Sequence, residues 1–377
     1  MSALYIHIPF CSSKCPYCDF FSQVGTPRQL DGYVDLLKLN LTILKRDFPD
    51  TSAFDTIFFG GGTPSLLSVA QLAALLSTIQ NHFDINPEAE ITLEANPGTV
   101  DSTKLEGYRN AGVNRLSLGI QSLNDYNLQA LGRIHTAGQA RECVVAARQA
   151  GFDNLSLDLI FALPGQTLSG MEREITNLLE LKPEHISLYG LSFEEGTDFF
   201  KRLTRGELKA CDENVYAEQY KMIHRELSRA GFEHYEISNF ALPGFRCRHN
   251  QIYWQRRNCL AIGCGAHSFI ERNWGERWHI PGALTQYQAA LTQGMNPAEQ
   301  LEVFDRSGAM KEFIYLALRT KDGLSAADFL QRFGERPDKS FSLAFAKTSR
   351  YLQQSDSRWH FDPEAWLLYD HLITHFL

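Results

Sequence analysis

The sequence predicts an α/β fold around a parallel sheet, and three observations indicate it. Short β-branched or apolar runs alternate with longer amphipathic segments from the start of the chain to about residue 190. Helix-capping residues and glycines stand at the ends of the amphipathic segments. Cysteines and polar residues follow several of the short runs. The six β-α units imply parallel strands with helices outside them, in either an open doubly wound sheet or a partial barrel.

Six strands and five helices are expected in this first part of the chain. The strand candidates are residues 4–8, 55–60, 90–95, 115–120, 154–161 and 185–191. The helical patterns lie between them, at residues 29–46, 68–83, 101–111, 124–150 and 168–181. Ser68 and Asp101 are expected to cap the N-termini of two helices, and Gly112 and Gly151 to end two of them.

After residue 191 the alternation ends. A helix is expected at residues 212–230, and a mixed stretch rich in glycine and aromatic residues follows it. From about residue 305 the pattern is that of a small helical or winged-helix-like appendage. The expected domains are therefore a first domain at 1–195, an α+β region at 196–300 that extends it, and a C-terminal domain at 301–377.

The bulk composition limits the classes of function. The 377 residues carry a formal net charge of −8, which argues against binding to a nucleic-acid backbone. No apolar run is long enough to span a bilayer, and Cys11 comes too early for a secretory signal peptide. Eight cysteines in a chain without an export signal indicate reduced thiols or metal ligands. We therefore expect a cytoplasmic protein.

Chemically unusual residues follow the expected strands. Three cysteines come directly after the first strand, and the sequence GGGTP at residues 60–64 follows the second. The third strand carries Glu94, the fourth leads to Gln121 and Ser122, and the fifth carries Asp158. Because the loops at the carboxyl ends of parallel strands converge on one face, we expect these distant residues to form one site.

The three cysteines, Cys11, Cys15 and Cys18, have the spacing CxxxCxxC. Three thiolates suit a four-iron cluster in which one iron has no protein ligand and can accept a small-molecule chelate. The aromatic Tyr17 beside the last cysteine could shield a planar ring bound nearby. The alternative is a structural zinc site completed by His7 or Asp19, although such sites usually come as paired CxxC motifs.

The cysteine motif and GGGTP together resemble the radical S-adenosylmethionine (SAM) superfamily. Within it, YIHIPFCSSKCPYCDF and FFGGGTPS resemble the branch of coproporphyrinogen III dehydrogenase (HemN), and the resemblance runs from Tyr5 to the C-terminal tail. It implies a partial (β/α)6 barrel, followed by an α+β region and a small C-terminal helical or winged-helix-like domain.

The resemblance also implies two cofactors, a [4Fe–4S] cluster and SAM. Cys11, Cys15 and Cys18 would ligate three irons, and the amino and carboxylate groups of SAM would chelate the fourth. The expected SAM contacts are Gly61, Gly62 and Thr63 for the amino group, Glu94 and Arg133 for the charged methionine end, Gln121 and Asp158 for the ribose hydroxyls, and Tyr5 and Tyr17 beside the cluster.

Two features differ from the dehydrogenase pattern. That pattern continues with a fourth cysteine two positions after the third, where this chain has Phe20. The dehydrogenase also has a longer N-terminal segment, whereas the first strand is expected here from residue 4. Both differences argue against the decarboxylation of coproporphyrinogen III by this chain.

A further motif, HNxxYW, lies in the stretch RCRHNQIYWQRRN and resembles the HemW branch, a family of heme chaperones. The resemblance implies that His249 binds heme, for which imidazole is a common axial ligand. Tyr253 and Trp254 offer flat apolar faces to a macrocycle, and Cys247 is an alternative ligand. Four arginines could pair with the propionates: Arg246, Arg248, Arg256 and Arg257.

The sequence therefore predicts a heme chaperone on a scaffold that binds a [4Fe–4S] cluster and SAM. The expected partners are heme and heme-accepting proteins of the respiratory, membrane-associated kind. Neither nucleic-acid binding nor a membrane span is expected, and a homodimer and the cleavage of SAM are left open. The alternatives are a radical SAM oxidoreductase that decarboxylates coproporphyrinogen III and a zinc-stabilised binding barrel without a redox role.

Overall fold

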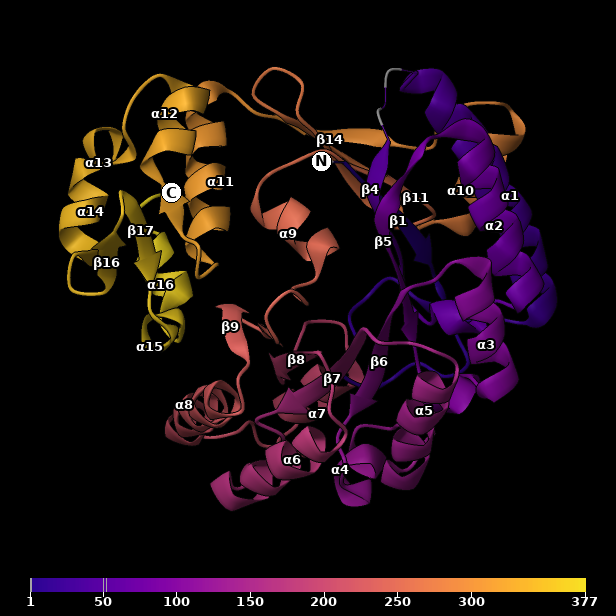
Figure 1. Cartoon of the computed structure of the whole chain (residues 1–377), viewed down its shortest axis with the longest axis horizontal. Coiled ribbons are helices and arrows are strands. Elements are labelled where there is room, and N and C mark those ends of the chain that lie inside the picture. The colour runs from indigo at the N-terminus through magenta and orange to yellow at the C-terminus, as the bar shows by residue number, and fades with distance from the viewer. Residues whose placement is uncertain (1, 50, 52) are drawn as a thin grey trace.

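The computed structural model describes residues 2–377 except residues 50 and 52 (Figure 1). Six parallel strands form the centre of its large sheet and are neighbours in their sequence order. They are β1 (Ala3–Ile8), β4 (Phe54–Gly61), β5 (Ile85–Ala95), β6 (Arg115–Gln121), β7 (Leu155–Phe161) and β8 (His185–Gly190). A doubly wound sheet reverses its strand order at a switch point, whereas this order has no reversal. The partial (β/α)6 barrel is therefore confirmed.

The helices between these strands lie on the outer side of the sheet (Figure 1). They are α1 (Pro27–Asp47), α2 (Val69–His82), α3 (Ser102–Ala111), α4 (Asp125–Ala130), α5 (Ala137–Gln149) and α6 (Leu168–Glu180). The two predicted N-caps are confirmed: Ser68 Oγ accepts a hydrogen bond from the Gln71 backbone (3.2 Å), and Asp101 Oδ1 from the Lys104 backbone (2.8 Å). Gly112 ends α3 at a φ of 113°, in the left-handed region that favours glycine.

The single helix predicted at residues 124–150 is wrong, because the structure divides it into α4 and α5. Gly132 adopts a φ of 66°, which an α-helix cannot continue through. Thr136 then caps the N-terminus of α5 in a reciprocal capping box with Gln139. The division matters for function, since it places Arg133 in a loop.

Residues after 195 extend the sheet at both edges. Beyond β8 lie β10 (Asn239–Ala241) and β9 (Glu233–Glu236), both antiparallel. On the other side, β11 (Cys259–Ile262) runs parallel to β1, and β12 (His267–Ile270), β13 (Glu276–His279) and β14 (Glu299–Val303) follow it antiparallel. The helices of this region are α7 (Asp198–Thr204), α8 (Glu213–Arg229), α9 (Arg248–Trp254) and α10 (Leu284–Thr292).

The chain ends in a separate group of helices around a small antiparallel sheet, which we call the C-terminal unit (residues 306–377). Its helices are α11 (Arg306–Leu318), α12 (Ala326–Phe333), α13 (Pro337–Ser340), α14 (Ser342–Thr348), α15 (Pro363–Trp366) and α16 (Tyr369–Ile373). Its strands are β15 (Leu324–Ser325), β16 (Leu352–Ser355) and β17 (Arg358–Phe361). This combination of helices and three strands agrees with the predicted winged-helix-like appendage.

Helix α9 lies between the barrel and the C-terminal unit (Figure 1) and contacts β4 on one side and α11 on the other. The hydrophobic core is continuous across this junction, since Leu4 in the barrel and Phe376 near the C-terminus belong to one buried cluster. In the described part of the chain, no helix is both long and apolar enough to cross a bilayer.

Candidate functional site

A cavity of about 410 Å³, the strand-end cavity, lies at the carboxyl ends of the parallel strands. Its volume falls in the range of ordinary ligand sites. The structure brings most of the predicted site residues together around it: Cys11, Cys15, Tyr17, Cys18, Gly61, Gly62, Thr63, Glu94, Gln121, Arg133 and Asp158. They come from different strand ends and their loops, as the geometry of parallel β/α proteins predicts. Tyr5 and His249 do not line this cavity.

The cysteines lie in a loop that is closed at its base by two short strands, β2 (Phe10–Cys11) and β3 (Gln23–Val24). A turn inside the loop is fixed by the hydrogen bond from the Cys18 backbone to the Cys15 carbonyl oxygen (3.2 Å). Cys11 is buried, and Cys15 and Cys18 are half-buried. Burial raises the pKa of Cys18, and the neighbouring sulfurs of Cys15 and Cys11 raise it further. Three such thiolates need a positive charge between them, which the irons of a cluster would supply.

The zinc alternative requires a fourth ligand from His7 or Asp19. Both ring nitrogens of His7 are already engaged, Nδ1 with the Tyr5 hydroxyl (3.0 Å) and Nε2 with the Phe21 carbonyl oxygen (2.9 Å). Among the described residues, no three metal-ligating side chains are close enough to hold a single ion. Tyr5 does not line the strand-end cavity, and its hydroxyl group holds the ring of His7 in place.

Two of the three glycines of the GGGTP motif are required by close packing. Gly61 has a φ of 116°, and a Cβ atom there would lie 2.7 Å from His7 Cε1. A Cβ atom on Gly62 would lie 2.9 Å from Cys11 Sγ. The motif thus lets the backbone approach the first cysteine, and it leaves room for a ligand beside the sulfur.

Two carboxylates face the same cavity. Glu94 Oε2 accepts a hydrogen bond from the Gly61 backbone (3.1 Å), and Asp158 accepts from Ser117 (2.8 Å) and Ser156 (2.9 Å). Burial and then the charge of Asp158 raise the pKa of Glu94 to about 8. Burial also raises the pKa of Asp158. A ligand with a positively charged amino group would relieve this repulsion.

Arg133 reaches the cavity from the loop between α4 and α5. Its Nη1 donates to Cys15 Sγ (3.4 Å), and its Nη2 donates to the Gly119 carbonyl oxygen (2.9 Å) and to Asn96 Oδ1. Its Nε–H is buried and has no partner in the described part of the chain. The guanidinium is thus fixed beside a cysteine with a donor unused, as expected for a group that pairs with a ligand carboxylate.

Gln121 ends β6 in a strained conformation, with a φ of 61° beside an irregularity in the β6–β7 register. Strain of this kind concentrates at functional sites. Ser117 and Gly119 line the cavity from the same face of β6. The sequence interpretation missed Ser117 and Asn96, although their signals were present: Ser117 is polar at the same strand parity as Gln121, and Asn96 follows Glu94 in EANP.

His249, the predicted heme ligand, is 1% exposed and faces the barrel. Its Nδ1 shares a hydrogen bond with Thr56 Oγ1 (2.8 Å), and its Nε2 with the Tyr253 hydroxyl (3.0 Å). Burial, followed by the charge of Arg115, lowers the pKa of His249 to about 3, so the imidazole is neutral. A neutral ring has the lone pair that iron requires, but one hydrogen bond must break before a metal can reach it.

The other residues of the motif point in two directions. Tyr253 packs with His249 on the barrel side, whereas Trp254 lines a second cavity between α9 and the C-terminal unit. This α9 cavity has a volume of about 830 Å³. Cys247 is buried beside Glu90, and burial raises its pKa to about 12.

The four arginines predicted to meet propionates already have partners. Arg246 forms ion pairs with Glu233 and Asp322, and Arg256 with Glu312. Arg248 donates to the Glu88 carbonyl oxygen, and Arg257 pairs with Glu271. Arg246, Arg256 and Arg257 line the α9 cavity, whereas Arg248 does not.

Family models match both ends of the chain. Residues 5–178 match the Radical SAM superfamily, and residues 305–368 match the HemN C-terminal domain. A solved structure described as coproporphyrinogen III oxidase (HemN) from Escherichia coli, a radical SAM enzyme, superposes with a TM-score of 0.84 over 100% of this chain and 89% of that one. At 21% sequence identity, this likeness establishes the shared fold.

Curated relatives match over most of the chain. The heme chaperone HemW of Lactococcus lactis is 37% identical over 88% of this chain and 85% of its own length. That of Haemophilus influenzae is 36% identical over 100% of this chain and 97% of its own length. That of Escherichia coli is 39% identical over 71% of this chain and 70% of its own length.

Proposed function

The chain belongs to the HemW family of the radical SAM superfamily, and from this membership we propose that it is a heme chaperone that binds heme and passes it to acceptor proteins. The observation that carries the proposal is the HNxxYW motif in a chain that is 36–37% identical to curated heme chaperones over most of its length. The scaffold for this function is the strand-end cavity with its cluster and SAM.

The donor set of the strand-end cavity fits both cofactors. Cys11, Cys15 and Cys18 would hold three irons of a [4Fe–4S] cluster, and the cluster would supply an open iron for the amino and carboxylate groups of SAM. Glu94 would accept a hydrogen bond from the iron-bound amino group, and Arg133 would pair with the carboxylate.

The remaining SAM contacts follow from the same cavity. Gln121 and Asp158 would bind the ribose hydroxyls, with Ser117 orienting Asp158. Tyr17 would cover the cluster, because its ring lies in the cavity wall against Phe199 at 6.1 Å between ring centroids. Tyr5 would act behind the cluster by fixing His7.

His249 would bind the heme iron. Its neutral imidazole suits a metal, and α9 would have to move away from the barrel for iron to reach the ring, because His249 is buried against β4. The hydrogen bond between Tyr253 and His249 would break when iron binds, since the Tyr253 hydroxyl contacts the Nε2 atom.

The acceptors proposed are membrane-associated respiratory proteins, and the proposed compartment is the cytoplasm. Phe20 replaces the fourth cysteine of the dehydrogenase pattern and is 64% exposed at the strand-end cavity. This substitution favours the chaperone over an enzyme that decarboxylates coproporphyrinogen III.

The experiment that tests the proposal combines binding with turnover. Anaerobically purified protein is reconstituted with iron and sulfide and then titrated with heme. The proposal expects heme to bind at a defined stoichiometry, and no protoporphyrinogen to form from coproporphyrinogen III with SAM and a reductant. Repeated turnovers of decarboxylation would favour the enzyme instead.

A further inference from the structure

The α9 cavity lies on the opposite side of the motif helix from His249. Helix α9 contributes Gln251 and Trp254 to its wall, and the C-terminal unit contributes Arg332, Phe333 and Arg358. With a volume of about 830 Å³, it is large enough for a cofactor-sized ligand. His249 does not line it, so iron ligation by that residue does not explain its presence.

One wall of the α9 cavity has more positive than negative charge. Arg257 Nη1 and Arg332 Nη1 lie 3.3 Å and 3.4 Å from the same oxygen atom, Glu271 Oε1. Burial, and then the charge of Arg257, lowers the pKa of Arg332. Two guanidinium groups thus share one carboxylate, so a further carboxylate would be attracted to this wall.

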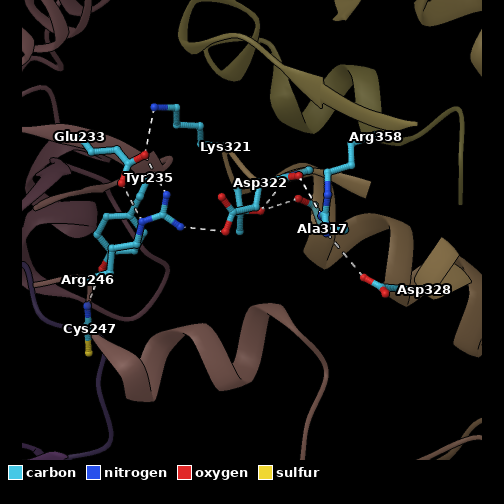
Figure 2. Close-up of polar contacts among 11 residues, drawn as sticks. Glu233, Tyr235, Arg246, Cys247, Ala317, Lys321, Asp322, Asp328 and Arg358 are labelled. Carbon is cyan, nitrogen blue, oxygen red and sulfur yellow. Dashed lines mark hydrogen bonds and ion pairs between the residues drawn. The ribbon is translucent and has the colours of Figure 1, made fainter. Parts of the chain in front are cut away.

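Another part of the cavity wall is built around Arg246 (Figure 2). This guanidinium joins Glu233 to Asp322 of the C-terminal unit, and it lies 5.5 Å from the centre of the Tyr235 ring. Arg358 donates to the Asp322 carbonyl oxygen (3.3 Å), and its ion pair with Asp328 is long, at 3.9 Å. The wall therefore provides a second guanidinium, on Arg358, that is only weakly engaged.

Aromatic side chains line the same cavity. Trp274 and Phe333 stack with their ring centroids 6.0 Å apart at 21°, and both line the cavity together with Trp254 and Phe313. The buried indole N–H of Trp254 has no acceptor among the described residues. Guanidinium groups already lie over two of these rings, Arg319 over Trp254 (4.8 Å) and Arg332 over Phe313 (5.0 Å). A wall that combines aromatic rings with guanidinium groups suits a flat, apolar ring that carries carboxylates.

We propose that the α9 cavity binds the porphyrin macrocycle through its two propionates and its flat face, independently of the iron. This inference rests on the proposed heme-chaperone function and deepens it: the C-terminal unit supplies Arg332 and Arg358 for recognition, while His249 acts on the iron in a separate step. The macrocycle is then held jointly by the motif helix and the C-terminal unit.

Metal-free protoporphyrin IX tests the inference, because it has the propionates but no iron for His249 to bind. We expect it to bind the full-length protein, with its fluorescence as the readout. Arg332→Gln should weaken this binding about tenfold or more, since it removes a charge-assisted contact. Protoporphyrin dimethyl ester lacks both free carboxylates. It should bind the unmodified protein as weakly as protoporphyrin IX binds the Arg332→Gln variant.

Two matched variants distinguish a specific loss of binding from a general loss of folding. Arg350→Gln changes an exposed arginine of the C-terminal unit that does not line the cavity, and it should bind protoporphyrin as the unmodified protein does. Glu271→Gln removes the carboxylate that competes for Arg257 and Arg332, so it should strengthen binding severalfold. A variant that merely damages the fold would not gain affinity.

The outcomes separate this inference from the function on which it rests. Equal porphyrin affinities for Arg332→Gln and Arg350→Gln would overturn the inference, as would a protein that binds heme but not metal-free protoporphyrin. Heme binding through His249 would survive either result. Conversely, arginine-dependent porphyrin binding without any release of heme to an acceptor would support the cavity and reject the chaperone.

Discussion

Cys11, Cys15 and Cys18 line the strand-end cavity, and none of the other cysteines does. Replacement of any one of them by Ala is expected to abolish the broad visible absorption of a [4Fe–4S] cluster, because no other thiol can replace the lost ligand. The cluster content of each variant is measured after anaerobic reconstitution, by absorption spectra and by analysis of iron and sulfide. Cys143→Ala, at a buried position in α5, is the control. One zinc and no iron in the anaerobic protein would contradict the prediction.

Glu94 makes the binding of SAM depend on pH. Its folded-state pKa is raised from 4.5 to about 8, so the folded protein keeps a proton that the unfolded chain releases. The free energy of unfolding should therefore fall as the pH rises through this window. A hydrogen bond from the amino group of SAM favours the ionised carboxylate, so we expect the affinity for SAM to rise between about pH 6.5 and 8.5.

Calorimetry in buffers of different ionisation enthalpy would measure the proton released when SAM binds. Glu94→Gln should remove the part of the proton release and of the pH dependence that comes from this carboxyl group. Glu88→Gln, at an exposed position of the same strand, should preserve both. Equal proton release and equal pH dependence for Glu94→Gln and the unmodified protein would show that Glu94 does not contact the amino group.

His249→Ala is expected to alter the Soret band of bound heme while the cluster spectrum stays intact. The imidazole is neutral and lies on α9, away from the strand-end cavity, so its loss would remove the proposed iron ligand without disturbing the cysteines. Absorption spectra of heme titrations measure the change. An unchanged spectrum and affinity would exclude His249 as the ligand and point to Cys247.

The sequence predicted which residues lie together at the strand-end cavity where the signals are local. Cysteine spacing and the glycine motif identify residues whose roles depend on near neighbours, and Gly62 indeed packs against Cys11. The enclosure of His249 could not be predicted, because it depends on Thr56, a residue 193 positions away in the sequence. For the same reason, the motif pattern did not reveal that Tyr253 and Trp254 face opposite sides.

At the level of elements, the N-terminus of α9 is held by a buried carboxylate. Glu90 of β5 accepts hydrogen bonds from the backbones of Arg248 and His249 (both 3.1 Å), and Cys247 Sγ lies 3.7 Å away. Glu90→Ala should lower the free energy of unfolding by about 2–3 kcal/mol, because buried donors lose a charged acceptor. It should also weaken heme binding, since the motif helix loses its anchor.

Denaturant unfolding and heme titration measure these two effects. Glu88→Ala, at an exposed position two residues earlier on β5, is the matched control and should change neither. Heme binding that is unaffected by the loss of Glu90 would show that the position of α9 does not matter for the ligand.

The predictability of elements depended on whether their ends carry local signals. Ser68 and Asp101 predicted the N-termini of α2 and α3, and the structure confirms both caps. The break between α4 and α5 was missed because both halves are amphipathic and the pattern continues across Gly132. The short strands at the sheet edges could not be predicted, since their partners come from distant segments.

For the molecule as a whole, buried ion pairs join the barrel region to the C-terminal unit. Arg256 and Glu312 lie 2.5 Å apart with side chains 5% and 10% exposed. Glu312→Gln should lower the free energy of unfolding by about 3–5 kcal/mol, because it leaves the Arg256 guanidinium buried without a counter-charge. Scanning calorimetry should then resolve separate transitions for the two parts.

Glu335→Gln provides the control, because its pair with Arg306 is exposed and should contribute little. A single transition at an unchanged temperature for Glu312→Gln would show that the hydrophobic core alone holds the C-terminal unit. The sequence indicated this unit from its helical pattern, whereas its attachment through α9 and these pairs required the structure.

The transfer of heme tests the central claim most directly. Reconstituted protein is loaded with one equivalent of heme, mixed with a heme-free respiratory acceptor, and separated from it, and the absorption spectra of both are recorded. The account predicts that the acceptor gains the heme when it is mixed with the unmodified protein. It also predicts that the acceptor gains less heme from the His249→Ala variant. Protein that never binds heme at a defined stoichiometry, or that retains it in the presence of the acceptor, would contradict the account.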